Sequence, residues 1–166
     1  MNIKLFDYHL PQKLIAQKPV SPRDHSRLLV LDRKNKKIQH KHFYDLADIL
    51  NGDDVLVLNE TKVFPARLKA QKKTGGFLEI FLLQPLSQDV YRVMVGGRRF
   101  SVGDTVQIAR NFTAIFLQQE KDNIWQVKFN VRAKILDKKI EQYGQTPLPP
   151  YIKSLDNKFI RQRYQT

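Results

Sequence analysis

Cysteine is absent from the 166 residues of this chain, so disulfides and metal sites built on thiolates are excluded. No apolar run approaches the roughly 20 residues that a membrane-spanning helix needs. Residues 1–17 place charged side chains among the apolar positions, which is unlike a secretory signal peptide. We therefore expect a soluble, cytoplasmic protein that does not act in a membrane.

Acidic residues are also scarce. The chain has 16 Asp and Glu against 29 Lys and Arg, a formal net charge of +13, and its pI is near 10.0. A surface this positive attracts polyanions, and release of their counterions drives binding. Nucleic acid is the first expectation for a partner, and an anionic membrane surface is the second. The hydrophobic fraction of 42% is ordinary for a globular protein.

Several familiar catalytic motifs are missing as well. The chain has no nucleophile elbow, phosphate-binding loop or dinucleotide fingerprint. His40 and His42 would share one side of a strand, but two histidines without a third ligand are weak evidence for a metal site. We therefore expect no metal, and a metal-dependent hydrolase has little support.

The most informative segment that is present is the run from Asp54 to Leu68. Its four consecutive apolar residues, Val55–Leu58, predict a strand covered on both faces, as in a parallel sheet. Ligands of open α/β sheets bind at the carboxyl ends of such strands. The polar residues that follow this strand are Asn59, Glu60, Thr61 and Lys62. They form either a ligand site or a simple turn leaving the core.

The fold class follows from a change of pattern along the chain. Residues 63–130 contain six short strand-like runs separated by turn residues, which is typical of a small antiparallel barrel. Helical periodicity occurs before this block, at Phe43–Leu50, and after it, from Ile135 to Gly144; a further helix is expected from Asp156. We therefore predict a mixed α/β main domain (residues 1–62 and 131–166) interrupted by an inserted β-barrel domain (residues 63–130).

One single basic residue and one group of basic residues in this block are candidates for binding. Arg67 is suited to a phosphate or carboxylate, or equally to a barrel surface charge. A basic rim for RNA phosphates is predicted near the turns of the barrel, against the alternative of scattered solvated charges. Its members are Lys72, Lys73, Arg98, Arg99 and Arg110.

Six blocks in order resemble the S-adenosylmethionine:tRNA ribosyltransferase-isomerase family of queuosine synthesis. They are FDYHLPQKLIAQKP (6–19), RDHSRLLVLD (23–32), DVLVLNETKVFPARL (54–68), TGGFLEIFLL (74–83), PLPPYI (147–152) and RYQT (163–166). Residues 89–130 carry almost none of the resemblance. The family's fold, an α/β domain interrupted by a barrel, agrees with the independent expectation.

The resemblance implies a reaction on tRNA. The ribosyl part of S-adenosylmethionine, the co-substrate, moves onto the aminomethyl-deazaguanine of a tRNA with a GUN anticodon. It then rearranges to give epoxyqueuosine, and adenine and methionine are released. The substrate-binding candidates are Asn59, Thr61, Lys62, Arg67 and Tyr151. No residue is identified as the general base.

Two departures from the family pattern bear on activity. Tyr143-Gly144 stands where the family usually has His-Gly, and the chain ends at Thr166 although the family continues with several further blocks. We therefore expect a truncated chain, from a broken gene or a fragment or with its other half encoded separately, that is inactive alone. The alternative is a non-catalytic, basic RNA-binding module.

Overall fold

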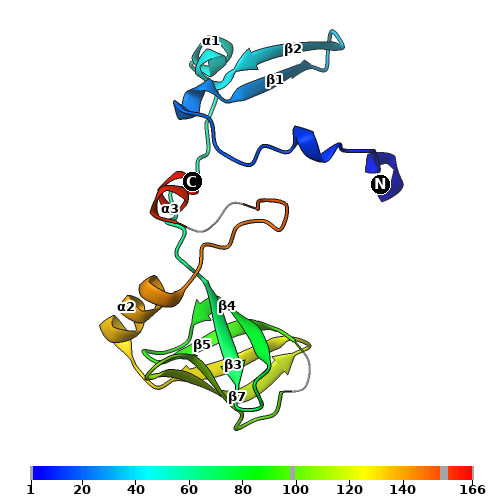
Figure 1. Cartoon of the computed structure of the whole chain (residues 1–166). Coiled ribbons are helices and arrows are strands. Elements are labelled where there is room, and N and C mark those ends of the chain that lie inside the picture. Colours follow the sequence, from blue (N-terminus) through cyan, green and yellow to red (C-terminus); the bar gives the residue numbers. More distant parts are fainter. Residues whose placement is uncertain (1, 98–99, 154–156, 166) are drawn as a thin grey trace. The chain divides into compact units, whose positions relative to one another are not determined.

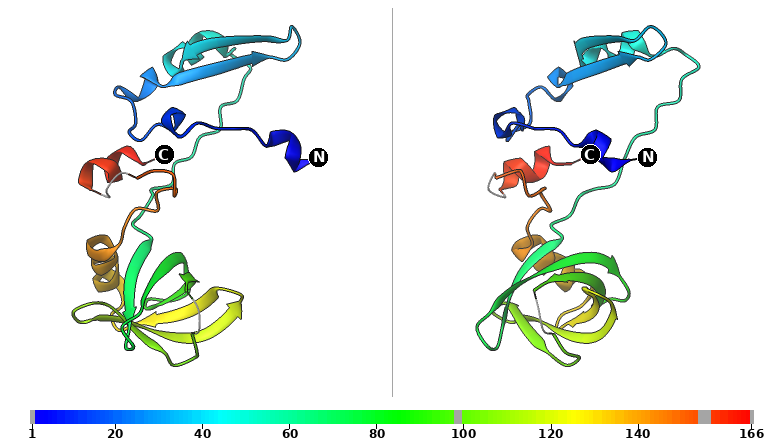
Figure 2. Two further views of the ribbon diagram at one scale, coloured as in Figure 1. Left: turned by 45° about the vertical axis from the view of Figure 1, so that its right-hand side comes forward. Right: turned by 90° about the vertical axis from the view of Figure 1, so that its right-hand side faces the viewer.

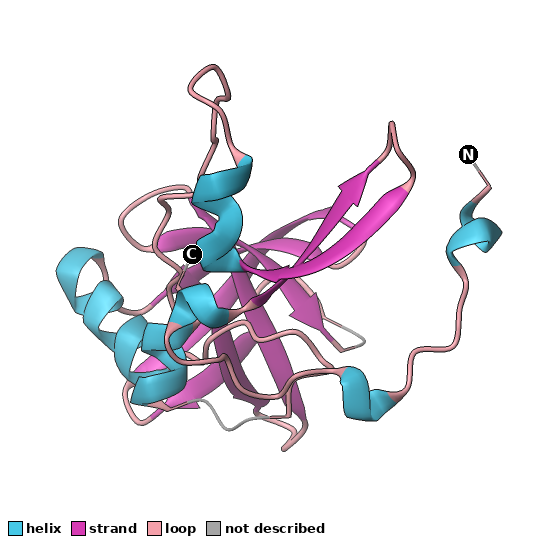
Figure 3. Cartoon of the chain, turned by 90° about the horizontal axis from the view of Figure 1, so that it is seen from above, coloured by secondary structure: helices cyan, strands magenta, loops and turns pink. Residues whose placement is uncertain are grey.

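The computed structural model describes residues 2–97, 100–153 and 157–165, which divide into two compact units (Figure 1). We call residues 1–61 with 149–164 the terminal unit, and residues 62–148 with Gln165 the barrel unit. None of the described helices is long and apolar enough to cross a membrane. Among the described residues, the barrel unit contains six strands and one helix, and the terminal unit contains two strands and six short helical elements. Figure 3 colours these strands and helices by type.

The barrel unit is a closed, antiparallel barrel of six strands (Figure 2). The strands are β3 (Arg67–Lys72), β4 (Phe77–Pro85), β5 (Val90–Gly96), β6 (Thr105–Ala109), β7 (Phe112–Lys121) and β8 (Ile124–Phe129). Their order around the barrel is β3-β4-β5-β8-β7-β6. The closing seam between β3 and β6 has only two residue pairs, Gln71 with Gln107 and Lys72 with Val106. This confirms the barrel predicted from the strand-like runs.

Alternation of side chains builds the barrel core. On β3, Leu68 and Ala70 are buried while Lys69 between them is exposed, because successive side chains of a strand point to opposite faces. Aromatic rings fill the interior at one place: the Phe116 ring stacks on Phe100 at 4.9 Å and meets Trp125 edge-on at 5.2 Å. Such offset and edge-to-face pairs stabilise the folded barrel beyond the stabilisation that comes from burying the rings' apolar area.

Helix α2 (Ala133–Tyr143) covers part of the barrel and belongs to its core. Leu136 and Ile140, four residues apart, are buried in the same hydrophobic cluster as the strands. The helix ends at Gly144, as the sequence predicted, with the Gly144 N–H donating to the Ile140 carbonyl at 2.8 Å. The next residue, Gln145, exchanges two backbone hydrogen bonds with Arg67. The predicted boundaries of the two domains are not tested by this packing and stay a prediction.

The terminal unit consists of short elements. A hairpin is formed by β1 (Arg27–Asp32) and β2 (Lys37–His42). The helical elements are η1 (Ile3–Phe6), η2 (Gln12–Leu14), η3 (Arg23–His25), η4 (Phe43–Asp45), α1 (Leu46–Ile49) and α3 (Lys158–Arg163). Helix α3 begins after Asn157, whose Oδ1 accepts from the Ile160 N–H at 2.9 Å. The predicted start at Asp156 lies outside the described residues.

The expectation of a buried strand at Val55–Leu58 is wrong for the chain as described. These residues lie in an extended segment without strand pairing, and Val55 and Val57 are 88% and 87% exposed. A strand needs a neighbour for its N–H and C=O groups, and no described strand lies beside this segment. Within the described ranges the only sheets are antiparallel, so these residues by themselves show a mostly β protein rather than an α/β sheet.

The turn of the terminal-unit hairpin offers a pH test. The backbone and side-chain N–H groups of Asn35 donate to the Asp32 carboxylate at 3.0 and 2.7 Å, which lowers the pKa of Asp32. A depressed carboxyl pKa stabilises the folded turn above the unfolded value of about 3.9. That stabilisation is lost as the pH falls through the folded pKa.

Replacing Asn35 by alanine is therefore expected to raise the pKa of Asp32 towards its ordinary value, because the side-chain donor is removed. Carboxyl carbon chemical shifts followed by NMR against pH measure the change. The same titration of the wild-type chain gives the reference curve for Asp32. An unchanged Asp32 curve would contradict the assigned cause.

Candidate functional site

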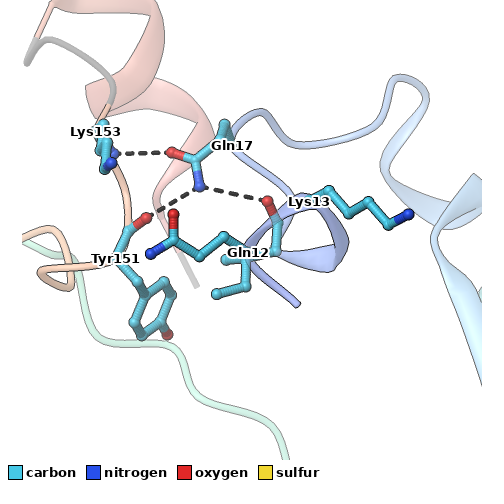
Figure 4. A pocket seen from close by; sticks show the side chains of 6 residues that line it. Gln12, Lys13, Gln17, Tyr151 and Lys153 are labelled. Carbon is cyan, nitrogen blue, oxygen red and sulfur yellow. Dashed lines mark hydrogen bonds between the residues drawn. The ribbon is translucent and has the colours of Figure 1, made fainter. Parts of the chain in front are cut away.

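A hollow in the terminal unit lies between two segments far apart in the sequence. It has a volume of about 490 Å³ and is lined by Gln12, Lys13, Ile15, Gln17, Tyr151 and Lys153 (Figure 4). The first four residues belong to η2 and the turn after it, and the last two follow the proline-rich stretch 147–150. We call this hollow the Tyr151 pocket. Its volume is within the range of small-molecule sites.

The side-chain amide of Gln17 holds these two segments together. Its Nε2 donates to the carbonyl oxygens of Tyr151 at 3.0 Å and Ile15 at 3.3 Å, and its Oε1 accepts from the Lys153 N–H at 2.9 Å (Figure 4). The amide thus occupies the backbone groups on both sides of residue 152, as a neighbouring strand would. The Tyr151 side chain itself is left 57% exposed.

The chemistry of the Tyr151 pocket is set by what lines it. An aromatic ring with a hydroxyl, two ammonium groups and the amide of Gln12 surround an aliphatic side chain, Ile15. Aromatic rings stack on planar heterocycles, and ammonium groups attract carboxylates or phosphates. None of its lining residues is Asp, Glu or His, so the described walls contain no carboxylate or imidazole to act as a general base. The pocket is suited to binding a ligand that has a planar ring and a carboxylate or phosphate group.

The other predicted substrate-binding residues are placed elsewhere. Asn59, Thr61 and Lys62 are exposed in the extended segment after Val55–Leu58, and none is among the lining residues of the Tyr151 pocket. Arg67 is half-buried on β3, where its Nε lies 3.2 Å from Glu79 Oε1 in an ion pair whose angle is outside hydrogen-bond geometry. That contact fits the alternative of a barrel surface charge.

The predicted basic rim is divided by the structure. Lys72 and Lys73 line a second hollow of about 500 Å³ at one end of the barrel, which we call the barrel-end pocket. Arg110 is exposed in the turn between β6 and β7, at the other end of β6 from this pocket. Five residues of strand separate the two places by about 17 Å. The predicted Arg98 and Arg99 lie outside the described residues.

Possible metal ligands do not gather within the described part of the chain. No three His, Asp or Glu side chains come close enough there to hold an ion. His42 instead stacks on Tyr44 at 5.1 Å, and its Nδ1 lies 3.1 Å from the Tyr44 hydroxyl. The structure therefore gives this histidine a packing partner.

Sequence reasoning missed Gln17, Gln12 and Phe100. Gln17 acts across 134 positions of sequence, so no local spacing could have indicated its role. Phe100 lines the barrel-end pocket beside the two lysines, and a weak signal was available, since an aromatic residue follows the basic pair at 98–99. Aromatic and basic residues close together are typical of single-stranded nucleic-acid sites.

By its fold and its site, this is a basic β-barrel protein with a second unit that carries a pocket of mixed polar and aromatic lining. Residues 3–166 match the family model described as "Queuosine biosynthesis protein". The chain belongs to this family.

Individual relatives extend the comparison. The S-adenosylmethionine:tRNA ribosyltransferase-isomerase of Thermotoga petrophila is 42% identical over 167 residues, which is 100% of this chain and 48% of that protein. The enzyme of the same name from Aquifex aeolicus is 39% identical over 166 residues, again 100% of this chain and 49% of the relative. The crystal structure of S-adenosylmethionine tRNA ribosyltransferase from Thermotoga maritima aligns with a TM-score of 0.43 and 38% identity, over 84% of this chain and 48% of that one. The chain thus spans about half the length of these relatives.

Proposed function

We propose that this chain supplies the amino-terminal part of an S-adenosylmethionine:tRNA ribosyltransferase-isomerase. The observation that carries the proposal is the 42% identity along the whole chain to the Thermotoga petrophila protein of that name. The proposed reaction moves the ribosyl part of S-adenosylmethionine onto the aminomethyl-deazaguanine of a tRNA with a GUN anticodon. It yields epoxyqueuosine and releases adenine and methionine.

The proposal includes a mixed α/β main domain (residues 1–62 and 131–166) into which the barrel (residues 63–130) is inserted. In support, Val55–Leu58 carry four apolar side chains that are more than half exposed. An apolar run of this kind is stable in a sheet with neighbours on both sides. We propose that sequence corresponding to the other half of the relatives provides those neighbours.

S-adenosylmethionine is the proposed ligand of the Tyr151 pocket. Its adenine can stack on the exposed ring of Tyr151, and its methionine carboxylate can pair with the ammonium group of Lys13 or Lys153. Asn59, Thr61, Lys62 and Arg67 remain proposed contacts of the same substrates. The chemistry starts when a base removes a proton from the ribose methylene next to the sulfonium, which acidifies that position.

The described walls of the Tyr151 pocket contain no Asp, Glu or His, and this supports one further element of the proposal. The 166 residues alone bind the co-substrate but do not complete the reaction. The base and the remaining walls are proposed to come from sequence equivalent to the unmatched half of the relatives.

Binding of S-adenosylmethionine by the isolated chain is the first test. We expect saturable binding in equilibrium dialysis and a loss of at least about tenfold in affinity for Gln17→Ala, because residues 151–153 are then no longer held beside η2. Gln39→Ala changes an exposed glutamine of β2 in the same unit and should bind normally. Equal affinity of both variants and the wild type would contradict the site.

Mass spectrometry of nucleosides is the second part of this test. The chain is incubated with S-adenosylmethionine and tRNA that carries the precursor base, with the full-length Thermotoga petrophila relative as the positive control. We expect epoxyqueuosine only in the control. Its formation by the 166-residue chain would refute the proposed inactivity.

A non-catalytic RNA-binding module is the second candidate, and the charge distribution favours it. Residues 62–148 hold 15 Lys and Arg against 7 Asp and Glu, which is +8 of the total +13. RNA binding that weakens with salt fits both functions. Failure to bind S-adenosylmethionine together with retained RNA binding would select the module.

A further inference from the structure

The two faces of the Phe100 ring at the barrel end have different neighbours. One face stacks on Phe116, with the centroids 4.9 Å apart and the planes 12° from parallel. The Lys72 Nζ lies 3.8 Å from the Phe100 centroid. Because Phe116 occupies one face at van der Waals distance, the ammonium group lies over the other. A buried aromatic ring thus supports Phe100 from inside, and the flexible side chain of Lys72 lies over it from outside.

The surroundings of this ring combine charge with hydrogen-bonding groups. The barrel-end pocket, about 500 Å³, is lined by Lys72, Lys73, Thr74, Phe100, Asp104 and Thr105, together with Gly103 and Val106. Asp104 is the acidic residue among them, and its Oδ2 accepts from the Ser101 N–H at 2.9 Å. That bond fixes the turn before β6. The two lysines leave the pocket with a net positive charge.

We propose that the barrel-end pocket binds one unpaired nucleotide of an RNA, with the base stacked on the outer face of Phe100. Lys72 leaves the ring and pairs, with Lys73, with the adjoining phosphates. The exchange is favourable because a base offers a whole π-face where the ammonium offers one point of contact. The ammonium group in turn pairs with a phosphate, and Thr74 and Thr105, which line the same pocket, supply hydroxyls to bond the base edge. This inference rests on the proposed function in tRNA modification and names the subsite for the RNA.

The position of Trp125 provides a signal for this event. It is the only tryptophan of the chain, and its ring lies 6.4 Å from Phe100 at an interplanar angle of 73°. A base stacked on Phe100 changes the environment of this ring pair, whereas a phosphate held only by lysines does not reach it. Intrinsic fluorescence therefore separates stacking from electrostatic attraction.

The experiment compares two fluorescently labelled oligoribonucleotides of about eight nucleotides, one with bases and one abasic, on the whole chain. By anisotropy, the base-bearing strand should bind about tenfold more tightly, as one stacked base provides. It alone should change the Trp125 emission. Phe100→Leu should remove this difference while the abasic strand binds as before. Equal binding of the two strands to the wild type would overturn the proposal.

Charge variants keep the test decisive if Phe100→Leu does not fold. Lys72→Met and Lys73→Met should weaken both strands severalfold and lower the salt dependence of binding. The matched control Arg110→Met, at the other end of β6, should leave the preference for the base-bearing strand intact. An effect of Arg110→Met equal to that of the two lysine variants would overturn the assignment to this pocket.

Two further arms separate alternatives from the proposal. Nucleoside monophosphate that binds as tightly as the oligonucleotide would identify a site for free nucleotides and overturn the RNA assignment. If tRNA binds but base-bearing and abasic strands are equal, only the stacking inference fails. If S-adenosylmethionine and tRNA both fail to bind, the proposed function is contradicted together with this inference.

Discussion

Replacing Gly144 by alanine is expected to destabilise the barrel unit by about 3 kcal/mol or more, a cost near the upper limit for overpacking a core. A Cβ atom at this position would lie 2.1 Å from the Pro65 carbonyl oxygen and 2.5 Å from the Ile140 carbonyl oxygen. Both obstacles are backbone, so no side-chain rotation relieves them. The clash would separate the end of α2 from the entry to β3, where Arg67 and Gln145 exchange hydrogen bonds.

Denaturant unfolding followed by Trp125 fluorescence measures this effect. Gly76→Ala is the matched control, since it has open space around its Cβ position and a backbone that does not require glycine. We expect the control to change the free energy of unfolding by less than about 0.5 kcal/mol, as for ordinary surface positions. A Gly144→Ala protein as stable as Gly76→Ala would mean that residues 65 and 144 do not approach in this way.

The second large effect is expected for Phe116→Ala, at about 3–5 kcal/mol. The Phe116 side chain is fully buried and contacts the rings of Phe100 and Trp125. Its removal leaves a cavity in the barrel and takes away the inner support of Phe100. We therefore expect loss of preferential binding of the base-bearing oligoribonucleotide as well as loss of stability.

Chemical denaturation with wild-type and mutant chains at the same temperature measures the stability change. Phe77→Ala removes a ring that is 81% exposed on β4 and should be close to neutral. Phe116→Leu keeps most of the buried volume and should cost less than the alanine change. If alanine at 116 and at 77 had equal effects, the aromatic cluster would not be the centre of the barrel core.

The barrel could be predicted from the sequence because its signals are local. Alternating residues such as Leu68, Lys69 and Ala70 fix the inner face of a strand within a few positions. Turn residues then fix where each strand ends. The helix that ends at Gly144 was predictable for the same reason, since Leu136 and Ile140 recur at helical spacing.

The extended segment at Val55–Leu58 shows where local signals fail. Its composition indicates burial, but burial requires a neighbour that the segment cannot specify by itself. The Tyr151 pocket could not be predicted for the same reason, because it depends on one amide that joins residues 134 positions apart. Of the predicted substrate-binding residues, the structure brings Tyr151 into a pocket through the shape of the chain around Gln17, which no spacing rule describes.

The backbone pairing of Arg67 with Gln145 bears on how such a barrel segment can be inserted into a larger domain during evolution. The chain passes through neighbouring points at Arg67 and Gln145, so the segment of 77 residues between these two residues begins and ends at the same place. Because the two ends are adjacent, a larger domain can accommodate this segment at the position of a short loop. Domain insertions are tolerated most readily at such positions. Gain or loss of this segment by a larger chain therefore requires no movement of the residues before Arg67 relative to those after Gln145.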